Sequence, residues 1–216
     1  MKTKWASEKE LASVVIENLK KEGWTTYPEI LGIDIVAVKD DKIIAVEAKK
    51  HFNLKVISQA YKNRNFVNET WIAVTAGWQS LEDMGLIIAR KLNIGVMFVS
   101  KMSLGTETKY TVNNSFHPES LPFKKSIIEL LQPEAQTYAE AGSSGGKQWS
   151  NFTLTVSKLK SFIKQNNACT LTEAVRGIKH HYAHDKSAVA NLSKLMNQGV
   201  IKGIINSNGK LFIEEN

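Results

Sequence analysis

Residues 33–49 read IDIVAVKDDKIIAVEAK, two apolar runs on either side of the polar loop KDDK. The runs 33–38 and 43–49 are rich in β-branched residues, so we predict two strands joined as a hairpin. Side chains alternate between the two faces of a strand, so the register of this hairpin determines which polar residues meet.

The register that brings Val38 opposite Ile43 also brings Asp34 opposite Glu47. Opposed side chains on one face have Cβ atoms about 4.5–5.5 Å apart, so this register places two carboxylates side by side. Lys49 shares a face with Glu47, because the two are separated by one residue. The spacing therefore predicts a cluster of two acids and one ammonium group on one side of the hairpin.

Two like charges in apolar surroundings are unfavourable, and a divalent cation would offset them. Mg²⁺ prefers one or two carboxylates together with waters and phosphate oxygens. We therefore predict a magnesium site at Asp34 and Glu47, with Lys49 placed to orient a water or to stabilise charge on a phosphate. The alternative is a solvent-exposed strand end that carries an ordinary carboxylate–lysine ion pair.

The segments around the hairpin predict an α/β domain with the element order α-β-β-β-α-β-α-β. Helical periodicity predicts helices over residues 7–22, 54–66 and 81–92. Further strands are expected as a short strand around Tyr27 and as apolar runs at residues 71–75 and 94–100.

Composition divides the chain into three stretches. Residues 1–103 are periodic and carry a net charge of +3, and residues 151–216 are periodic and carry +5. Residues 104–150 carry −1, hold three of the four prolines and include the run AGSSGG, so we predict a linker with room for a short helix. Two domains joined by this linker are the expected organisation.

The whole chain of 216 residues has a formal charge of +7 and 43% hydrophobic residues, which excludes an intrinsically disordered tail. Charged and polar residues interrupt every apolar run well before the ~20 residues of a membrane span, and the N-terminus MKTKWASEKE lacks a signal-peptide core. Cys169 is the only cysteine, so no internal disulfide or cysteine zinc cluster can form. We therefore expect a cytoplasmic protein without a membrane partner.

Asp34, twelve intervening residues and then Glu47-Ala48-Lys49 resemble the D-(x)n-(D/E)-x-K signature of the PD-(D/E)xK, or restriction-endonuclease-like, nuclease superfamily. Ile33 stands where the name of that superfamily has proline. The segment 7–100 resembles the αβββαβ core of its Holliday-junction-resolvase and Mrr-like members. This resemblance implies a mixed sheet and Mg²⁺-dependent DNA cleavage in which Mn²⁺ can substitute, with Lys49 positioning the attacking water. It also implies the Ala48 carbonyl as a further metal ligand.

The same resemblance implies an acidic residue on the first helix and a glutamine on the helix after the hairpin. Glu8 fits the first role best, because it is in phase with the apolar face of its helix, and Glu10 and Glu17 follow in that order. Gln59 fits the second role. The alternatives are an acid that favours the helix N-terminus and an ordinary surface glutamine.

Residues 151–216 predict three helices and a hairpin, an order that resembles a winged helix, a small α+β domain. The expected elements are Val156–Gln165, Leu171–Ile178, Lys186–Asn197, Val200–Ile205 and Lys210–Ile213. In a winged helix the third helix enters the major groove, where Ser187, Asn191 and Lys194 would contact DNA. Cations that would meet phosphates are Arg176, Lys179, Lys186 and Lys210. The alternative is a winged helix used for protein contact or dimerisation.

The first functional hypothesis is a metal-dependent DNA endonuclease that hydrolyses phosphodiester bonds and is targeted by the winged helix, in restriction, recombination or transposition. The second is a non-catalytic DNA-binding or assembly protein with a nuclease-like scaffold. A third is a nuclease that is silent until a partner protein delivers it to DNA. Cleavage of both strands usually requires two active sites, so a homodimer or a partner protein is also expected.

Overall fold

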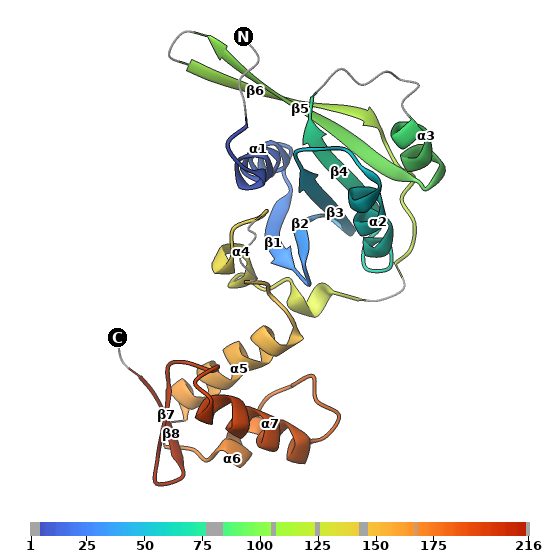
Figure 1. Cartoon of the computed structure of the whole chain (residues 1–216). Helices are drawn as coiled ribbons and strands as arrows, with labels where there is room; N and C mark the ends of the chain where they lie inside the picture. The colour runs from blue at the N-terminus through green and yellow to red at the C-terminus, as the bar shows by residue number, and fades with distance from the viewer. Residues whose placement is uncertain are drawn as a thin grey trace. The chain divides into compact units, whose positions relative to one another are not determined.

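The computed structural model describes residues 5–76, 84–104, 107–123, 126–142, 147–166 and 168–214. The chain divides into two compact units, Met1–Trp149 and Ser150–Asn216, shown in Figure 1. Each unit has its own core of buried apolar residues, so the two are described separately.

Unit 1 is an α/β unit built on a mixed six-stranded sheet in the order β1-β2-β3-β4-β5-β6. Strands β1, β2 and β3 are antiparallel, β3, β4 and β5 are parallel, and β6 returns antiparallel to β5. The strands span Thr25–Ile30, Ile33–Lys39, Lys42–Lys49, Glu69–Thr75, Ile94–Leu104 and Glu107–Phe116.

Helices cover both faces of this sheet, and Figure 1 shows α1 on one side and α2 with α3 on the other. Helix α1 spans Glu8–Lys21, α2 spans Leu54–Asn63 and α3 spans Met84–Lys91. The apolar stripe of each helix packs on alternate strand residues, so each strand buries one set of side chains under α1 and the other under α2 and α3.

The predicted hairpin is present with the predicted register. Strands β2 and β3 pair Val38 with Ile43 and continue in step to Ile35 and Val46. The predicted α/β class and element order are also confirmed up to β5, and the short strand around Tyr27 is β1. Helix α2 ends at Asn63 instead of residue 66, and the predicted residues 81–83 lie outside the described part of α3.

The prediction of a linker over residues 104–150 is wrong for the segment that forms β6. This strand pairs with β5 along nearly its whole length, although most of its residues are exposed. A strand with two exposed faces has no apolar alternation, so its sequence carries no strand signal. Trp149 also belongs to unit 1, since its N–H donates to the Glu29 carbonyl at 2.8 Å. The same stretch holds the short helices η1, Ile128–Leu130, and α4, Ala135–Tyr138.

Unit 2 consists of three helices followed by a two-stranded antiparallel hairpin, the order expected from the sequence. The hairpin turn is Asn208-Gly209, and both residues have positive φ, as the turn types favoured in two-residue hairpins require. The elements are α5, Asn151–Gln165; α6, Leu171–Arg176; α7, Asp185–Asn197; β7, Ile204–Ser207; and β8, Lys210–Ile213.

Helix α5 begins five residues earlier than predicted, because Ser150 accepts a hydrogen bond from the Thr153 N–H and caps it. Among the described helices of the whole chain, none is both long enough and apolar enough to cross a membrane.

Candidate functional site

Asp34 and Glu47 are the buried acids of the β2–β3 hairpin, with 6% and 2% of their surfaces exposed. The described pairing of β2 with β3 ends at Ile35 and Val46. The next residue on β2 is Asp34, and the next residue on β3 is Glu47. Ile35 and Val46 pack under α1, so alternation directs the acids to the face that α2 covers. Two carboxylates therefore lie at the end of one ladder, on the face of the sheet opposite α1.

Lys49 is bound to Asp34. The Lys49 Nζ lies 2.7 Å from Asp34 Oδ2, and the backbone N–H of Ala48 donates to the same oxygen at 2.9 Å. Burial alone would lower the pKa of Lys49, but the charge and hydrogen bond of Asp34, with smaller contributions from Glu8 and Glu47, raise it. The ammonium group therefore stays protonated at neutral pH and acts as a fixed positive charge.

Glu47 has one oxygen satisfied and one oxygen without a partner. Asn63 Nδ2 donates to Glu47 Oε1 at 2.7 Å, whereas Oε2 is buried and has no hydrogen-bond partner in the described part of the chain. Burial, and then the charge of Asp34, raise the pKa of Glu47 to about 8, while Asn63 and Lys49 oppose this shift. Without a further cation, the carboxyl group is therefore mostly protonated at pH 7.

The three N-terminal glutamates have different surroundings. Glu8 Oε2 lies 3.6 Å from the Lys49 Nζ, so α1 brings this acid to the hairpin cluster. Glu10 accepts hydrogen bonds from Lys101 at 2.6 Å and Tyr110 at 3.1 Å. Glu17 is exposed and pairs with its helix neighbour Lys20 at 3.5 Å. Glu8 is therefore the first-helix acid that the fold places beside Lys49.

A pocket of about 350 Å³ opens next to this cluster. Its walls come from α1, from the end of β3 with the loop that follows it, and from the first turns of α2. The lining residues are Glu8, Lys49, His51, Asn53, Lys55, Val56 and Gln59. Gln59 thus shares a pocket with Glu8 and Lys49, and its side chain is half-buried.

Asn63 was not predicted from the sequence, although it contacts Glu47 directly. A signal for it exists in the helix periodicity. Asn63 follows Gln59 by four residues and Val56 by seven, and such positions share one face of a helix. This spacing from Gln59 and Val56 is the sequence signal that places the Asn63 amide on the same helix face as Gln59.

A metal ion at this cluster would depend on few protein ligands. Among the described residues, no group of three His, Cys, Asp or Glu side chains is arranged to hold an ion. The hairpin offers two carboxylates instead, and each has an oxygen to spare. The described hydrogen bonds of Asp34 all go to Oδ2, which leaves Oδ1, and Glu47 retains Oε2. This donor set suits a hard cation that keeps several waters, as Mg²⁺ does.

In unit 2, the polar residues predicted to contact DNA lie on α7 and around it. Lys186, Asn191 and Lys194 are exposed on α7, whereas Ser187 is half-buried and donates to the His184 carbonyl at 2.8 Å. Asn191 Nδ2 donates to the Ser187 carbonyl at 2.9 Å. The remaining predicted cations, all exposed, are Arg176, Lys179 and Lys210.

The hairpin of unit 2 has two different faces. Leu211 is fully buried against the helices, whereas Ile205 and Phe212 pair across the strands and are 47% and 38% exposed. An apolar pair therefore lies on the outer face, beside the exposed Lys210.

Comparison of the chain with protein-family models, with curated proteins and with solved structures finds no significant match.

Proposed function

We propose that this protein is a metal-dependent DNA endonuclease that hydrolyses phosphodiester bonds. The observation that carries the proposal is the buried Oε2 of Glu47, which has no hydrogen-bond partner among the described residues and lies beside the charge of Asp34. A buried polar group left unsatisfied costs about 1–3 kcal/mol, and more when it is charged. A divalent cation would satisfy this oxygen and offset the repulsion between the two acids.

The residues that would hold the ion are Asp34 through Oδ1, Glu47 through Oε2 and Ala48 through its carbonyl. The N–H and C=O groups of one strand residue point to the same neighbouring strand. Since the Ala48 N–H points to Asp34, its carbonyl is directed to the same side as that acid. Glu8, held near Lys49, would complete the set from α1. The ion would lower the pKa of a bound water and offset charge on the scissile phosphate.

The part assigned to Lys49 follows from its environment. Its raised pKa makes it a donor and a positive charge, not a base. The ammonium group pairs with Asp34 at 2.7 Å and with Glu8 at 3.6 Å, so its position is defined before substrate arrives. In this role Lys49 donates a hydrogen bond to the attacking water or to a phosphate oxygen as negative charge grows there. Gln59 lines the same pocket and would help to orient the attacking water or the phosphate oxygen.

Unit 2 would supply affinity for DNA as a winged helix. Residues 151–216 carry a net charge of +5, and α7 presents Lys186 and Lys194 to solvent. Lysines that neutralise phosphates supply the salt-dependent part of DNA affinity. Restriction, recombination and transposition are the settings that suit a nuclease joined to such a module.

The proposal is tested by incubating plasmid, branched and single-stranded DNA with the full chain and Mg²⁺ or Mn²⁺. We expect cleavage by the wild type and none by Asp34→Ala or Lys49→Ala. Cleavage that survives both substitutions would show that the nuclease site lies elsewhere.

A second candidate function is a DNA-binding or assembly protein without catalysis. The observation that favours it is the exposed pair Ile205 and Phe212, since apolar side chains suit a protein partner better than a phosphate backbone. Intact DNA binding without cleavage would support this reading. Cleavage that appears only when a partner protein is added would instead identify a nuclease that is silent until it is delivered to DNA.

A further inference from the structure

The pocket beside the candidate site contains positive charge that the mechanism above does not use. Among the described residues that line it, Glu8 is the only acid, and Glu8 pairs with Lys49. Lys49 is also bound to Asp34, so its charge belongs to the hairpin cluster. The two other basic residues of the lining, His51 and Lys55, remain to be explained.

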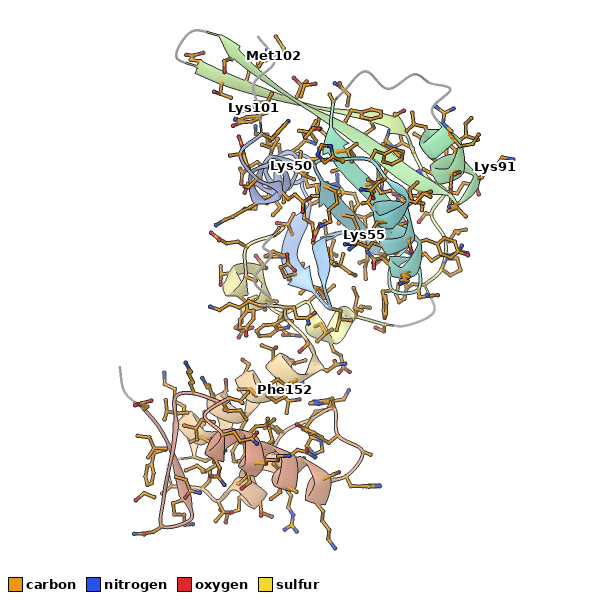
Figure 2. All side chains as sticks on the ribbon, in the orientation of Figure 1. Lys50, Lys55, Lys91, Lys101, Met102 and Phe152 are labelled. Atoms are coloured by element: carbon orange, nitrogen blue, oxygen red, sulfur yellow. The ribbon has the colours of Figure 1, made fainter. Side chains whose placement is uncertain are left out.

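His51 and Lys55 are exposed, and within the described part of the chain neither has an acid or a hydrogen-bond acceptor as a partner. Figure 2 labels Lys55 on α2 and Lys50 next to α1. Lys50 differs from the two, because its Nζ donates to the Ala6 carbonyl at 3.0 Å. The pocket wall formed by the β3–α2 loop and the first turn of α2 therefore carries the positive charge of Lys55 and the imidazole of His51, both without a partner among the described residues.

This wall is continuous with the cluster at the hairpin, since Lys49 and Glu8 belong to both. Asp34 and Glu47 are buried and do not line the pocket, whereas Lys49, which is bound to Asp34, does, so the pocket gives a phosphate access to Lys49. When one phosphate of a nucleic-acid strand lies at Lys49, the next phosphate of that strand lies a short distance away. The pocket offers this second phosphate the unpaired positive charge of Lys55.

We propose that His51 and Lys55 bind the phosphate next to the scissile one, so that the substrate is a polynucleotide strand and not an isolated phosphodiester. This inference rests on the proposed nuclease function. Lys55 acts as a point charge for a phosphate oxygen, and the His51 ring supplies an N–H donor. Both residues set the affinity for the strand, and neither takes part in the chemical step.

The test compares Lys55→Gln with Lys62→Gln in the full chain. Both lysines are exposed on α2, but Lys62 lies outside the pocket lining, so the second variant is a matched control for the lost charge. DNA affinity is measured by fluorescence anisotropy at salt concentrations of about 50 to 200 mM. A chelator is present throughout, because it prevents metal-dependent cleavage. We expect Lys55→Gln to lower the slope of log Kd against log salt by about 1. His51→Gln should weaken binding in the same direction, and Lys62→Gln should leave the slope unchanged.

A second measurement uses substrates with one and with many phosphates. With Mg²⁺ or Mn²⁺, Lys55→Gln should raise KM for an oligonucleotide with little change in kcat, and should leave hydrolysis of bis(p-nitrophenyl) phosphate unaltered. Equal effects of Lys55→Gln and Lys62→Gln on the salt slope would overturn the inference, whether or not the protein cleaves DNA. A wild type that cleaves nothing, while Lys55→Gln still lowers the slope, would leave the phosphate site standing and would favour the non-catalytic or partner-dependent alternative over the nuclease proposed above.

Discussion

Lys49 Nζ lies 2.7 Å from Asp34 Oδ2, which joins the last residue of β3 to the second residue of β2 through their side chains. The backbone N–H of Ala48 reaches the same oxygen, so that oxygen is doubly held. The two oxygens of the Asp34 carboxylate therefore have different roles. Oδ2 fixes the lysine, and Oδ1 remains for another ligand.

The first prediction concerns Lys49→Gln, which removes the positive charge and keeps an amide donor. We expect kcat for DNA cleavage to fall by about 10²–10³, the range observed when a donor to a developing charge is lost. Mn²⁺ affinity, measured by isothermal titration, should not fall, because both carboxylates remain. Lys50→Gln is the control, since Lys50 bonds the Ala6 carbonyl instead of the acids. Unchanged cleavage by Lys49→Gln would contradict its assigned part.

The second prediction concerns Asn63→Ala. Asn63 holds Glu47 Oε1, so its loss should leave the carboxylate free to turn and should weaken Mn²⁺ binding by about 10–100-fold, as for other partners of metal ligands. The control is Asn65→Ala, because Asn65 donates only to the Lys62 carbonyl in the described structure. Equal Mn²⁺ affinities for the two variants would show that Asn63 does not position Glu47.

The third prediction concerns the stability of the metal-free protein. The pKa of Glu47 in the folded state, about 8, lies above its ordinary value of 4.5, so the folded protein holds this proton more tightly than the unfolded chain. Folding stability should therefore fall as pH rises from about 4.5 to 8. Glu47→Gln removes this loss, and its Tm should exceed that of the wild type by roughly 3 °C or more at pH 8.

The same comparison has two internal controls. Well below pH 4.5, the pH-dependent part of the Tm difference between Glu47→Gln and wild type should vanish, because Glu47 is then protonated in both the folded and the unfolded states. Glu17→Gln, on the exposed face of α1, should not change the pH profile. A Tm difference for Glu47→Gln that is constant across pH would mean that the buried charge is not its cause.

The fourth prediction concerns unit 2. Lys186→Gln and Lys194→Gln should each lower the slope of log Kd against log salt by about 1 if α7 lies against DNA phosphates. Lys164→Gln on α5 serves as a charge-matched control at the end of another helix. Phe212→Ser should leave DNA affinity unchanged if the outer face of the hairpin serves a protein partner. If Phe212→Ser lost DNA affinity while Lys186→Gln and Lys194→Gln kept it, the hairpin and not α7 would be the DNA-binding surface.

The parts of unit 1 that the sequence predicted are those with a strong apolar period. The hairpin register follows from two apolar runs around a short polar loop, and it fixes the faces on which Asp34 and Glu47 lie. The phase of α1 also ranked Glu8 ahead of Glu10 as the acid that faces the hairpin, and Glu8 is the one found 3.6 Å from Lys49. Local periodicity sufficed in these cases, because the residues involved share one hairpin or one helix face.

The parts that were missed depend on contacts between distant segments. Strand β6 is exposed on most of its length, so its place in the sheet depends on backbone pairing with β5 and not on an apolar pattern. Asn63 reaches Glu47 only after α2 has packed on the sheet. The pKa of Glu47 likewise results from burial and from Asp34, neither of which one strand reveals.

The central claim is that Asp34 and Glu47 bind one metal ion, and a crystal structure of the protein soaked in Mn²⁺ tests it most directly. Anomalous scattering should show one manganese peak within about 2.0–2.4 Å of Asp34 Oδ1 and Glu47 Oε2, the range expected for a hard divalent cation and oxygen ligands. The same peak should be absent from Asp34→Asn crystals. A fully occupied manganese peak bound by other residues, with Glu47 Oε2 still unpartnered, would contradict the account.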